Sequence, residues 1–478
     1  MGRAIITNIV HLFYSTILAN LLQAISLIAL ANFLNAKNYG MFSVAIALIF
    51  VMLFFTDLGV SNTFLREGAK DGVDLSTIVS SYVKIRMVLF VLTSLIGYIA
   101  IHYFYEDKNL IYLMLNVMFL MLFGLTWQNI GITYFQLTER MKYIALIKVV
   151  SASFVIIITC FCIFGELPVY MTARLYGFGY MLGGLFSMYL MRKMTNIKMR
   201  VVMYKRLLRQ LGPFIVSGFL IMSTPQLAPI LLNYTLPLSM VGVFAVAYRM
   251  PAALYQVPGV IAGAFFPVLF KHYNQNNIEE HTKLNMLQMK LMALVGICMT
   301  IGLYHLAPYF ISIFFHNEWS NAVQPLQILS FLIVLQSVNI AIADGLTTSG
   351  SQNKRTAVQC VALVIGGIIL YALSSIGGVI GAAYAMVLLE VVALIGYIVV
   401  SEVRKQIVLQ IVLPYTICFG VTFIGVQYAL QAYHFIALTL NMIIVVVSIF
   451  LYDYELKKLS LSFIRKMRKK DYITKQEI

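Results

Sequence analysis

Long apolar runs, separated by short polar segments, dominate the sequence from one end to the other. A helix needs about 20 apolar residues to cross the hydrocarbon core of a bilayer. Fourteen runs reach or approach that length, and the number of spans falls to 12 if neighbouring runs are merged. The pattern therefore predicts an all-α polytopic membrane protein with about 14 transmembrane helices. The predicted spans are 6–30, 39–60, 77–100, 110–136, 142–164, 169–191, 211–232, 239–270, 291–314, 323–347, 356–374, 379–400, 408–430 and 435–452.

Composition supports a chain that is embedded along its whole length. Of the 478 residues 61% are hydrophobic and only 11% are charged, whereas a soluble domain carries about 25% charged residues. The first apolar run lacks a small-residue cleavage site, so no cleavable signal peptide is expected. The five cysteines lie within apolar runs and are interpreted as packing residues. No motif predicts a cofactor or a metal site.

Lysine and arginine positions predict the orientation. With a cytoplasmic N-terminus, 27 of the 34 basic residues fall in inside segments, 2 in outside loops and 5 within spans. Cytoplasmic loops are the ones that carry the excess of basic residues, so both termini are predicted to be cytoplasmic. The basic tail, with RKMRKK at 465–470, is then expected to contact lipid headgroups and not nucleic acid.

An enzymatic function is not expected. Every predicted outside loop is short, which argues against a membrane-embedded polymerase with external catalytic groups. The segment GSQNKRT at 350–356 lacks the spacing of a phosphate-binding loop, so no nucleotide hydrolysis is predicted.

The chain contains an internal repeat. The pattern G-x-F-x-V-A occurs at 40–45 and again at 242–247, and N-I-x-I occurs at 129–132 and 339–342. Two six-helix bundles of equal orientation are the geometry of an alternating-access transporter. The predicted organisation is an N-terminal lobe (1–195), a basic cytoplasmic linker (196–210), a C-terminal lobe (211–403), two additional helices (404–452) and a basic tail (453–478).

Three segments resemble a known family. The stretch NYGMFSVAIALIFVMLFFTDLGVSNTFLRE at 38–67 resembles the opening of bacterial polysaccharide transporters, the Wzx-type flippases of the multidrug/oligosaccharidyl-lipid/polysaccharide exporter superfamily. QLTERMKYIALIKV at 136–149 and IGGVIGAAYAMVLLEVV at 376–392 are similar to later family segments.

The resemblance implies translocation of undecaprenyl-pyrophosphate-linked oligosaccharide repeat units to the outer leaflet of the bacterial plasma membrane, for O-antigen or capsule synthesis. The expected partners are the lipid-linked oligosaccharide and membrane lipids, and no nucleic acid. The protein is expected to work as a monomer, with a polymerase and a chain-length protein as candidate protein partners.

Ionisable groups within spans are functional candidates because burying them is unfavourable. The basic groups outnumber the acidic ones, which suits an anionic pyrophosphate, since Arg binds phosphate oxygens in bidentate fashion. Arg249, near mid-membrane, is the leading candidate, and a structural ion pair is its alternative role. The substrate-binding candidates are Arg249, Arg86, Lys84, Arg66, Arg174 and Lys148.

Three carboxylates, Asp57, Asp344 and Glu390, are candidates for coupling to a proton or sodium gradient. Pairing with arginine or helix capping would explain each of them equally well, and Asp57 is expected to bond nearby backbone or Arg66. Two alternative functions share the fold. A cation-coupled drug or metabolite exporter would need acidic groups in the N-terminal lobe, where Asp57 is the sole candidate. A peptidoglycan-precursor flippase is disfavoured by the motif resemblance alone.

Overall fold

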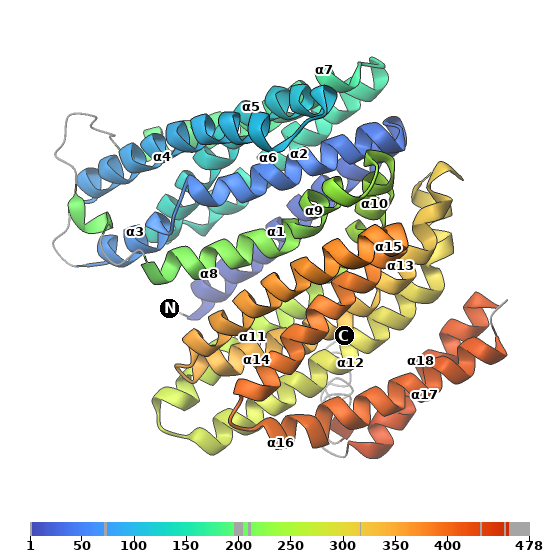
Figure 1. Cartoon of the computed structure of the whole chain (residues 1–478). Coiled ribbons are helices and arrows are strands. Elements are labelled where there is room, and N and C mark those ends of the chain that lie inside the picture. Colours follow the sequence, from blue (N-terminus) through green and yellow to red (C-terminus); the bar gives the residue numbers. More distant parts are fainter. Residues whose placement is uncertain are drawn as a thin grey trace, which may run out of the picture. The chain divides into compact units, whose positions relative to one another are not determined.

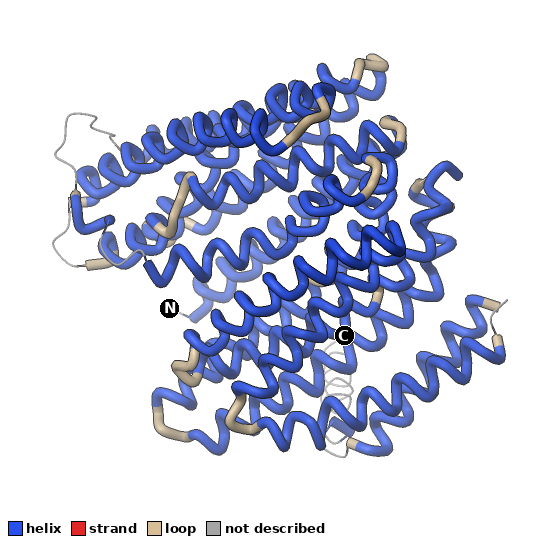
Figure 2. Tube along the Cα trace, viewed as in Figure 1, coloured by secondary structure: helices blue, strands red, loops and turns tan. Residues whose placement is uncertain are grey.

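The computed structural model describes residues 2–70, 74–195, 204–208, 212–315, 317–430, 433–453 and 456–457. Every regular element in these ranges is helical, and the tube in Figure 2 accordingly shows no strand among them. Eleven helical stretches in the described part of the chain are long and apolar enough to cross a membrane. The predicted all-α polytopic membrane fold is therefore confirmed, and the number of spans remains a prediction.

The first seven α-helices follow the predicted apolar runs closely (Figure 1). A short helix, α3, is the exception, since it follows α2 as a separate element. The bounds are α1 Gly2–Phe33, α2 Ala36–Phe55, α3 Val60–Gly68, α4 Leu75–Phe104, α5 Lys108–Leu137, α6 Met141–Phe164 and α7 Val169–Met194, followed by the 3-10 helix η1 Lys205–Leu208.

Proline interrupts the next helices, in the region where seven of the eleven prolines occur. Pro225 lies in a 3-10 turn, η2 (Thr224–Gln226), between α8 (Gly212–Ser223) and α9 (Leu227–Thr235). Pro251 lies inside α10 (Leu238–Leu254), just before the chain breaks into α11 (Gln256–Asn274). Proline lacks the amide hydrogen that continues a helix, so these spans are built from shorter pieces.

The remaining helices complete the chain as the apolar pattern predicts. The bounds are α12 Ile278–Phe314, η3 Asn317–Ala322, α13 Val323–Leu329, α14 Phe331–Thr348, α15 Gln352–Val400, α16 Arg404–Ile407, the π-helix η4 Val408–Val412, α17 Leu413–Ala429 and α18 His434–Tyr452. The 49-residue α15 is two helices joined at Gly378, whose φ of 58° and ψ of −139° are not helical. This conformation is readily adopted only by glycine. The break falls between the predicted spans 356–374 and 379–400.

The described residues divide into two compact units. Unit 1 lies within Met1–Val246 and Phe314–Trp319, and unit 2 lies within Ala247–Ile313 and Ser320–Ile478. In unit 1, α8 and α9 pack against α2. Helices from the predicted C-terminal lobe therefore share a compact unit with those of the predicted N-terminal lobe, and the proposed lobe boundaries remain a prediction.

The repeated G-x-F-x-V-A pattern marks a close helix crossing within unit 1. A Cβ atom on Gly40 of α2 would lie 1.8 Å from the carbonyl oxygen of Leu238, and one on Gly242 of α10 would lie 2.2 Å from that of Ala36. Small residues allow such backbone approach between membrane helices. Equivalent positions of the two repeats therefore form one contact between the first turns of α2 and α10.

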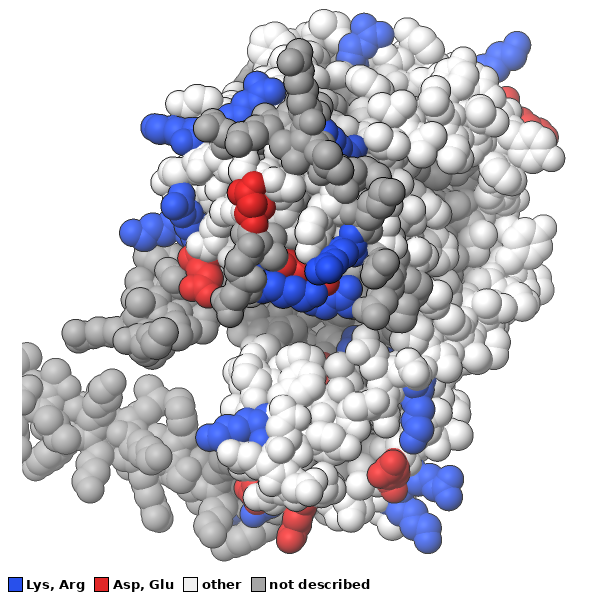
Figure 3. Space-filling view, turned by 90° about the vertical axis from the view of Figure 1, so that its left-hand side faces the viewer, with Lys and Arg blue, Asp and Glu red and all other residues white. Residues whose placement is uncertain are grey.

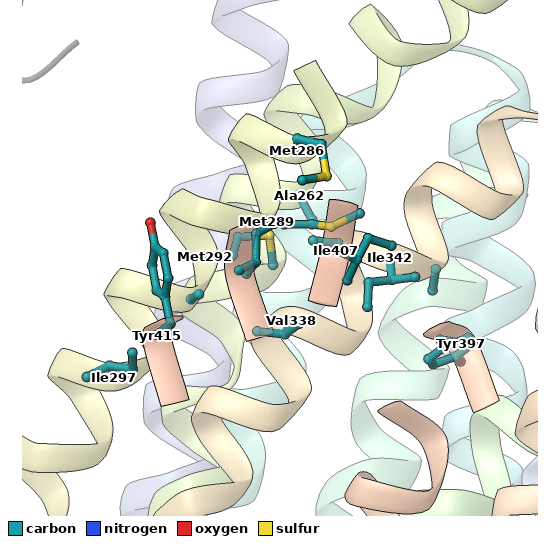
Figure 4. Packing of buried hydrophobic residues seen from close by; sticks show 14 of the residues in the cluster. Ala262, Met286, Met289, Met292, Ile297, Val338, Ile342, Tyr397, Ile407 and Tyr415 are labelled. Carbon is teal, nitrogen blue, oxygen red and sulfur yellow. The ribbon is translucent and has the colours of Figure 1, made fainter. Parts of the chain in front are cut away.

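The core of unit 2 includes the two additional helices. Met286, Met289 and Met292 of α12 pack in one cluster with Ile407 and Tyr415, as Figure 4 shows. Val445 and Ile449 of α18 belong to the same cluster. Methionine fills irregular gaps between helices because its side chain is unbranched and flexible. The segment 404–452 is thus packed into unit 2.

Basic side chains are exposed at the helix ends that the sequence places inside. In unit 1 the exposed residues include Arg66, Lys70, Arg140, Lys142 and Arg192. Figure 3 shows Lys and Arg side chains gathered on the face that contains these helix ends. This distribution fits the positive-inside rule, and the cytoplasmic location of the termini remains a prediction.

Candidate functional site

The segment Asp57-Leu58-Gly59 forms a tight turn between α2 and α3. Leu58 and Gly59 both have positive φ, 47° and 78°, a conformation that is unfavourable for leucine. The turn places Asp57 directly before α3, where its Oδ1 accepts hydrogen bonds from the Ser61 backbone N–H at 3.1 Å and from Ser61 Oγ at 2.6 Å. The expected bond from Asp57 to nearby backbone is present.

The main charged partner of Asp57 is Arg86 of α4. Their side chains form an ion pair in which the arginine side chain is only 1% exposed and the aspartate is 26% exposed. The guanidinium also donates to Ser61 Oγ at 3.0 Å and, more weakly, to Thr56 Oγ1 at 3.4 Å. The opposite charges neutralise each other and both groups are hydrogen-bonded, which are the main conditions under which a buried ion pair is tolerated. The buried Nε of Arg86 is the exception, since it has no hydrogen-bond partner among the described residues.

Arg66, the alternative to nearby backbone as an expected partner of Asp57, pairs with Glu67. Its side chain is 40% exposed, and its Nε lies 3.6 Å from Glu67 Oε1. Glu67 also accepts a hydrogen bond from Lys70 Nζ at 2.7 Å, and this bond lowers the pKa of the Glu67 carboxyl. Instead of a bond between Asp57 and Arg66, the structure has a local group formed by Arg66 and Glu67 of α3 and by Lys70, two residues after the end of that helix.

The other basic candidates of unit 1 have separate surroundings. Lys148 Nζ donates to Thr16 Oγ1 of α1 at 3.1 Å. Arg174 Nε donates to Asn116 Oδ1 at 2.9 Å, at an exposed site. Lys84 is half-buried on α4, two positions before Arg86. Lys148 and Arg174 therefore bond to groups outside the Asp57–Arg86 pair.

Both acidic candidates of unit 2 are held by amides. Glu390 of α15 accepts from Gln336 Nε2 at 3.0 Å and from Asn339 Nδ2 at 2.8 Å, so each carboxylate oxygen has a donor. Asp344 of α14 is buried and accepts from Gln288 Nε2 at 2.8 Å. Neutral amide donors therefore satisfy these carboxylate oxygens without supplying an opposite charge.

A polar cluster surrounds Glu390 in unit 2. Tyr248, next to Arg249 on α10, lies within electrostatic range of both Arg249 and Glu390. Tyr255 lies within range of Glu390, Asp344 and Arg355. We call this group the unit 2 polar cluster. It comprises Tyr248, Tyr255, Asp344, Arg355, Glu390 and Tyr397, and Arg249 adjoins it as the residue that follows Tyr248 on α10.

Sequence reasoning found only part of this cluster. Arg249, Asp344 and Glu390 are candidates from the sequence, whereas the tyrosines are not, and Arg355 lies between the predicted spans 323–347 and 356–374. Arg355 Nη1 donates to Thr347 Oγ1 at 2.8 Å, so it is anchored to α14. The sequence carries no helical spacing that indicates this grouping, because Tyr248 lies on α10, which ends at Leu254, and Tyr255 lies at the break before α11.

A second buried ion pair was also missed. Lys290 and Asp453 were assigned to cytoplasmic segments, yet Lys290 Nζ lies 3.0 Å from Asp453 Oδ2 with both side chains less than 10% exposed. Tyr415 of α17 donates to the same carboxylate oxygen at 3.3 Å. The pair therefore connects α12 to the end of α18.

No group of three or more His, Cys, Asp or Glu side chains with metal-binding geometry occurs among the described residues.

Comparison with known proteins adds a family assignment. The family described as "Polysaccharide biosynthesis protein" matches residues 5–273, which is more than half of the chain. No curated protein sequence gives a significant match.

Solved structures share the fold at low sequence identity. Lipid II flippase MurJ in an inward closed conformation matches with a TM-score of 0.72 at 12% identity, covering 93% of this chain and 99% of its own. An inward-facing multidrug resistance MATE family transporter of the MOP superfamily matches at 0.68 and 16%, covering 79% and 93%. A MOP superfamily transporter from Pyrococcus furiosus matches at 0.61 and 16%, covering 84% and 96%. The chain therefore has the fold of these transporters.

Proposed function

Because the chain belongs to the polysaccharide biosynthesis protein family, we propose that it is a flippase for undecaprenyl-pyrophosphate-linked oligosaccharide repeat units. It would carry them from the cytoplasmic to the outer leaflet of the bacterial plasma membrane by alternating access. One of the proteins with a similar structure, lipid II flippase MurJ, is also a flippase. The repeat units would then enter surface polysaccharide such as O-antigen or capsule.

The unit 2 polar cluster is the observation that carries this proposal. Arg249 lies eleven positions after the first residue of α10, and Glu390 lies eleven positions after the start of the predicted span 379–400. At 1.5 Å per residue both lie about 17 Å from the predicted outer ends of their helices. This depth is close to the middle of a hydrocarbon core about 30 Å thick, where a polar cluster needs a functional reason.

Arg249 is the group that we propose to bind the pyrophosphate. A guanidinium is permanently charged and presents a planar fork that matches two phosphate oxygens. Tyr248, its neighbour on α10, adds a hydroxyl group for a sugar or a phosphate oxygen. Arg86 has a different role in this proposal, since its guanidinium is already neutralised by Asp57 within unit 1.

Glu390 and Asp344 are the carboxylates that we propose for coupling to a proton or sodium gradient. Both accept amide hydrogen bonds and neither has a salt bridge in the described residues. Asp57 is the weakest of the three candidates, because Arg86 holds its charge. In reconstituted vesicles, collapse of the proton and sodium gradients should slow flipping by wild-type protein. An undiminished rate would contradict coupling and leave the flippase proposal standing.

The flippase proposal is tested in a strain that lacks this gene. Such a strain should lose surface polysaccharide and accumulate lipid-linked repeat units on the cytoplasmic side, and wild-type protein supplied from a plasmid should reverse both effects. Normal surface polysaccharide in the deletion strain would contradict the proposal.

A further inference from the structure

A pocket of about 640 Å³ opens at the end of unit 1 that the charge distribution predicts to be outer. Its walls come from three chain segments: the first turn of α2, the α4–α5 connection and the α9–α10 turn. The volume is within the range of about 300–1,000 Å³ that small-molecule sites occupy. None of its lining residues belongs to the unit 2 polar cluster.

Two tyrosines form an aromatic wall of this pocket. Tyr105 is 6% exposed, and its ring stacks on that of Tyr234 with 6.1 Å between ring centroids and 29° between ring planes. The Tyr234 hydroxyl donates to the Phe104 carbonyl oxygen at 3.2 Å, which fixes the outer ring. The Tyr234 ring is therefore a flat apolar surface, and it is held in place by stacking on Tyr105 and by the hydrogen bond to Phe104.

Polar groups complete the lining. Lys37, Glu106 and Ser239 are exposed at the pocket, and Asn233 is half-buried. The remaining carboxylate, Asp107, caps α5 by accepting from the Asn109 backbone N–H at 2.8 Å. Glu106 is therefore the carboxylate placed to accept hydrogen bonds from a ligand, while Asn233 and Ser239 can both donate and accept.

We propose that this pocket binds one sugar residue of the glycan on the outer side of the membrane, a step that rests on the proposed flippase function. A sugar ring has an apolar face that packs on aromatic rings, and its hydroxyl groups donate to carboxylates and accept from amides and lysine. Pyrophosphate is a less suitable ligand, because the pocket has two carboxylates, Glu106 and Asp107, and one lysine, Lys37, so the net charge of its lining is negative.

The pocket is linked to the crossing of α2 and α10. Lys37 lies three positions before Gly40, and Ser239 lies three positions before Gly242, the two glycines at which the helices meet. Any separation of these first turns would take the pocket walls apart. A sugar bound there therefore stabilises the arrangement in which α2 and α10 are in contact, because a ligand favours the state that holds its site.

The direct test is the thermal stability of the full-length protein in detergent with added sugars. The probes are glucose, galactose, N-acetylglucosamine and N-acetylgalactosamine, each compared with sorbitol at equal concentration to subtract general osmolyte stabilisation. At least one sugar should raise the unfolding temperature saturably above sorbitol. In Glu106→Gln and in Asn233→Ala its apparent Kd should rise at least tenfold.

A carboxylate outside the pocket provides the control for Glu106→Gln. Glu166→Gln changes an exposed carboxylate in the α6–α7 turn, outside the pocket, and should bind the sugar like wild type. Three results would overturn the proposal: no sugar exceeds sorbitol, Glu106→Gln and Glu166→Gln behave alike, or inorganic pyrophosphate stabilises the protein and loses this effect in Lys37→Ala. The last result would identify an anion site instead.

A parallel complementation assay separates this proposal from the flippase proposal. If wild-type protein restores surface polysaccharide to the deletion strain but no sugar binds, the pocket proposal fails and the flippase proposal stands. If wild-type protein does not restore the polysaccharide, the proposed function itself fails, whatever the sugar binding shows.

Discussion

Asp57 and Arg86, 29 residues apart in the sequence, form an ion pair between the α2–α3 turn and the buried side of α4. The pair explains why an apolar segment ends in Asp-Leu-Gly. The left-handed residues Leu58 and Gly59 turn the chain so that the Asp57 carboxylate meets the guanidinium, while Ser61 hydrogen-bonds both side chains. The motif that resembles the family opening thus has a packing role in unit 1.

Replacing Asp57 by Asn should destabilise the protein strongly, because Arg86 would keep its charge without a counter-ion. Loss of one partner of a buried ion pair typically costs about 3–5 kcal/mol. The double variant Asp57→Asn/Arg86→Gln should recover part of this loss. The measurement is denaturant or thermal unfolding in detergent, with Glu139→Gln at an exposed turn as the control. Equal stability of wild type and Asp57→Asn would contradict the structural role.

The glycine crossing gives a second prediction. Gly40→Ala and Gly242→Ala place a methyl group against a carbonyl oxygen, so the first turns of α2 and α10 must move apart. Overpacking of this kind costs about 1–3 kcal/mol. Gly259→Ala is the matched control, since a Cβ there meets nothing within 4 Å. Unfolding temperatures should fall for the first two variants only, and a similar fall in all three would refute a specific crossing.

The Lys290–Asp453 ion pair should stabilise the packing of α18 against α12. Lys290→Met alone leaves a buried aspartate without its counter-ion, and the expected loss is again about 3–5 kcal/mol. Lys290→Met/Asp453→Leu removes both charges and should approach wild-type stability. Hydrogen exchange should show the first variant loosened at α17 and α18 before the rest of unit 2. Uniform loosening of both units would argue against this role.

Glu67 gives a pH-dependent prediction outside the membrane. The Lys70 hydrogen bond lowers the pKa of Glu67 in the folded state, so the stabilisation is present above the ordinary glutamate pKa of about 4.3 and is lost as pH falls through the lower folded value. The stability difference between wild type and Glu67→Gln should therefore be constant near neutral pH and shrink below about pH 4.3. Unfolding midpoints measured across this range would show it, and a difference that grows on acidification would have the wrong sign.

Much of the fold could be predicted because the bilayer imposes a minimum apolar length on every span. The break in α15 is an example: the sequence predicts two separate spans, 356–374 and 379–400, and the structure breaks the helix between them at Gly378, in a conformation that favours glycine. The repeat at Gly40 and Gly242 can also be recognised in the sequence. The contact between the two helices at these glycines cannot, because a repeat does not show which segments are close in space.

The site was harder to predict because its members come from distant helices. Arg355 was counted with a loop by its position, yet it is anchored to Thr347. Lys290 and Asp453 lie outside the predicted spans, yet they form a buried ion pair, because hydropathy cannot distinguish a helix end in solvent from one buried by another helix. For Asp57 the sequence predicts a bond to nearby backbone or to Arg66; the backbone bond is present, but the turn at Gly59 directs the carboxylate to Arg86.

The central claim is that Arg249 binds the pyrophosphate of a lipid-linked substrate, and flipping by the purified protein in vesicles tests it most directly. Lipid-linked repeat units are placed in the vesicles, and the fraction reaching the other leaflet is measured over time for wild type, Arg249→Ala and Arg249→Lys. We predict that Arg249→Ala inserts and folds like wild type but loses flipping, and that Arg249→Lys keeps a reduced rate through its point charge. A wild-type rate in folded Arg249→Ala would contradict the claim.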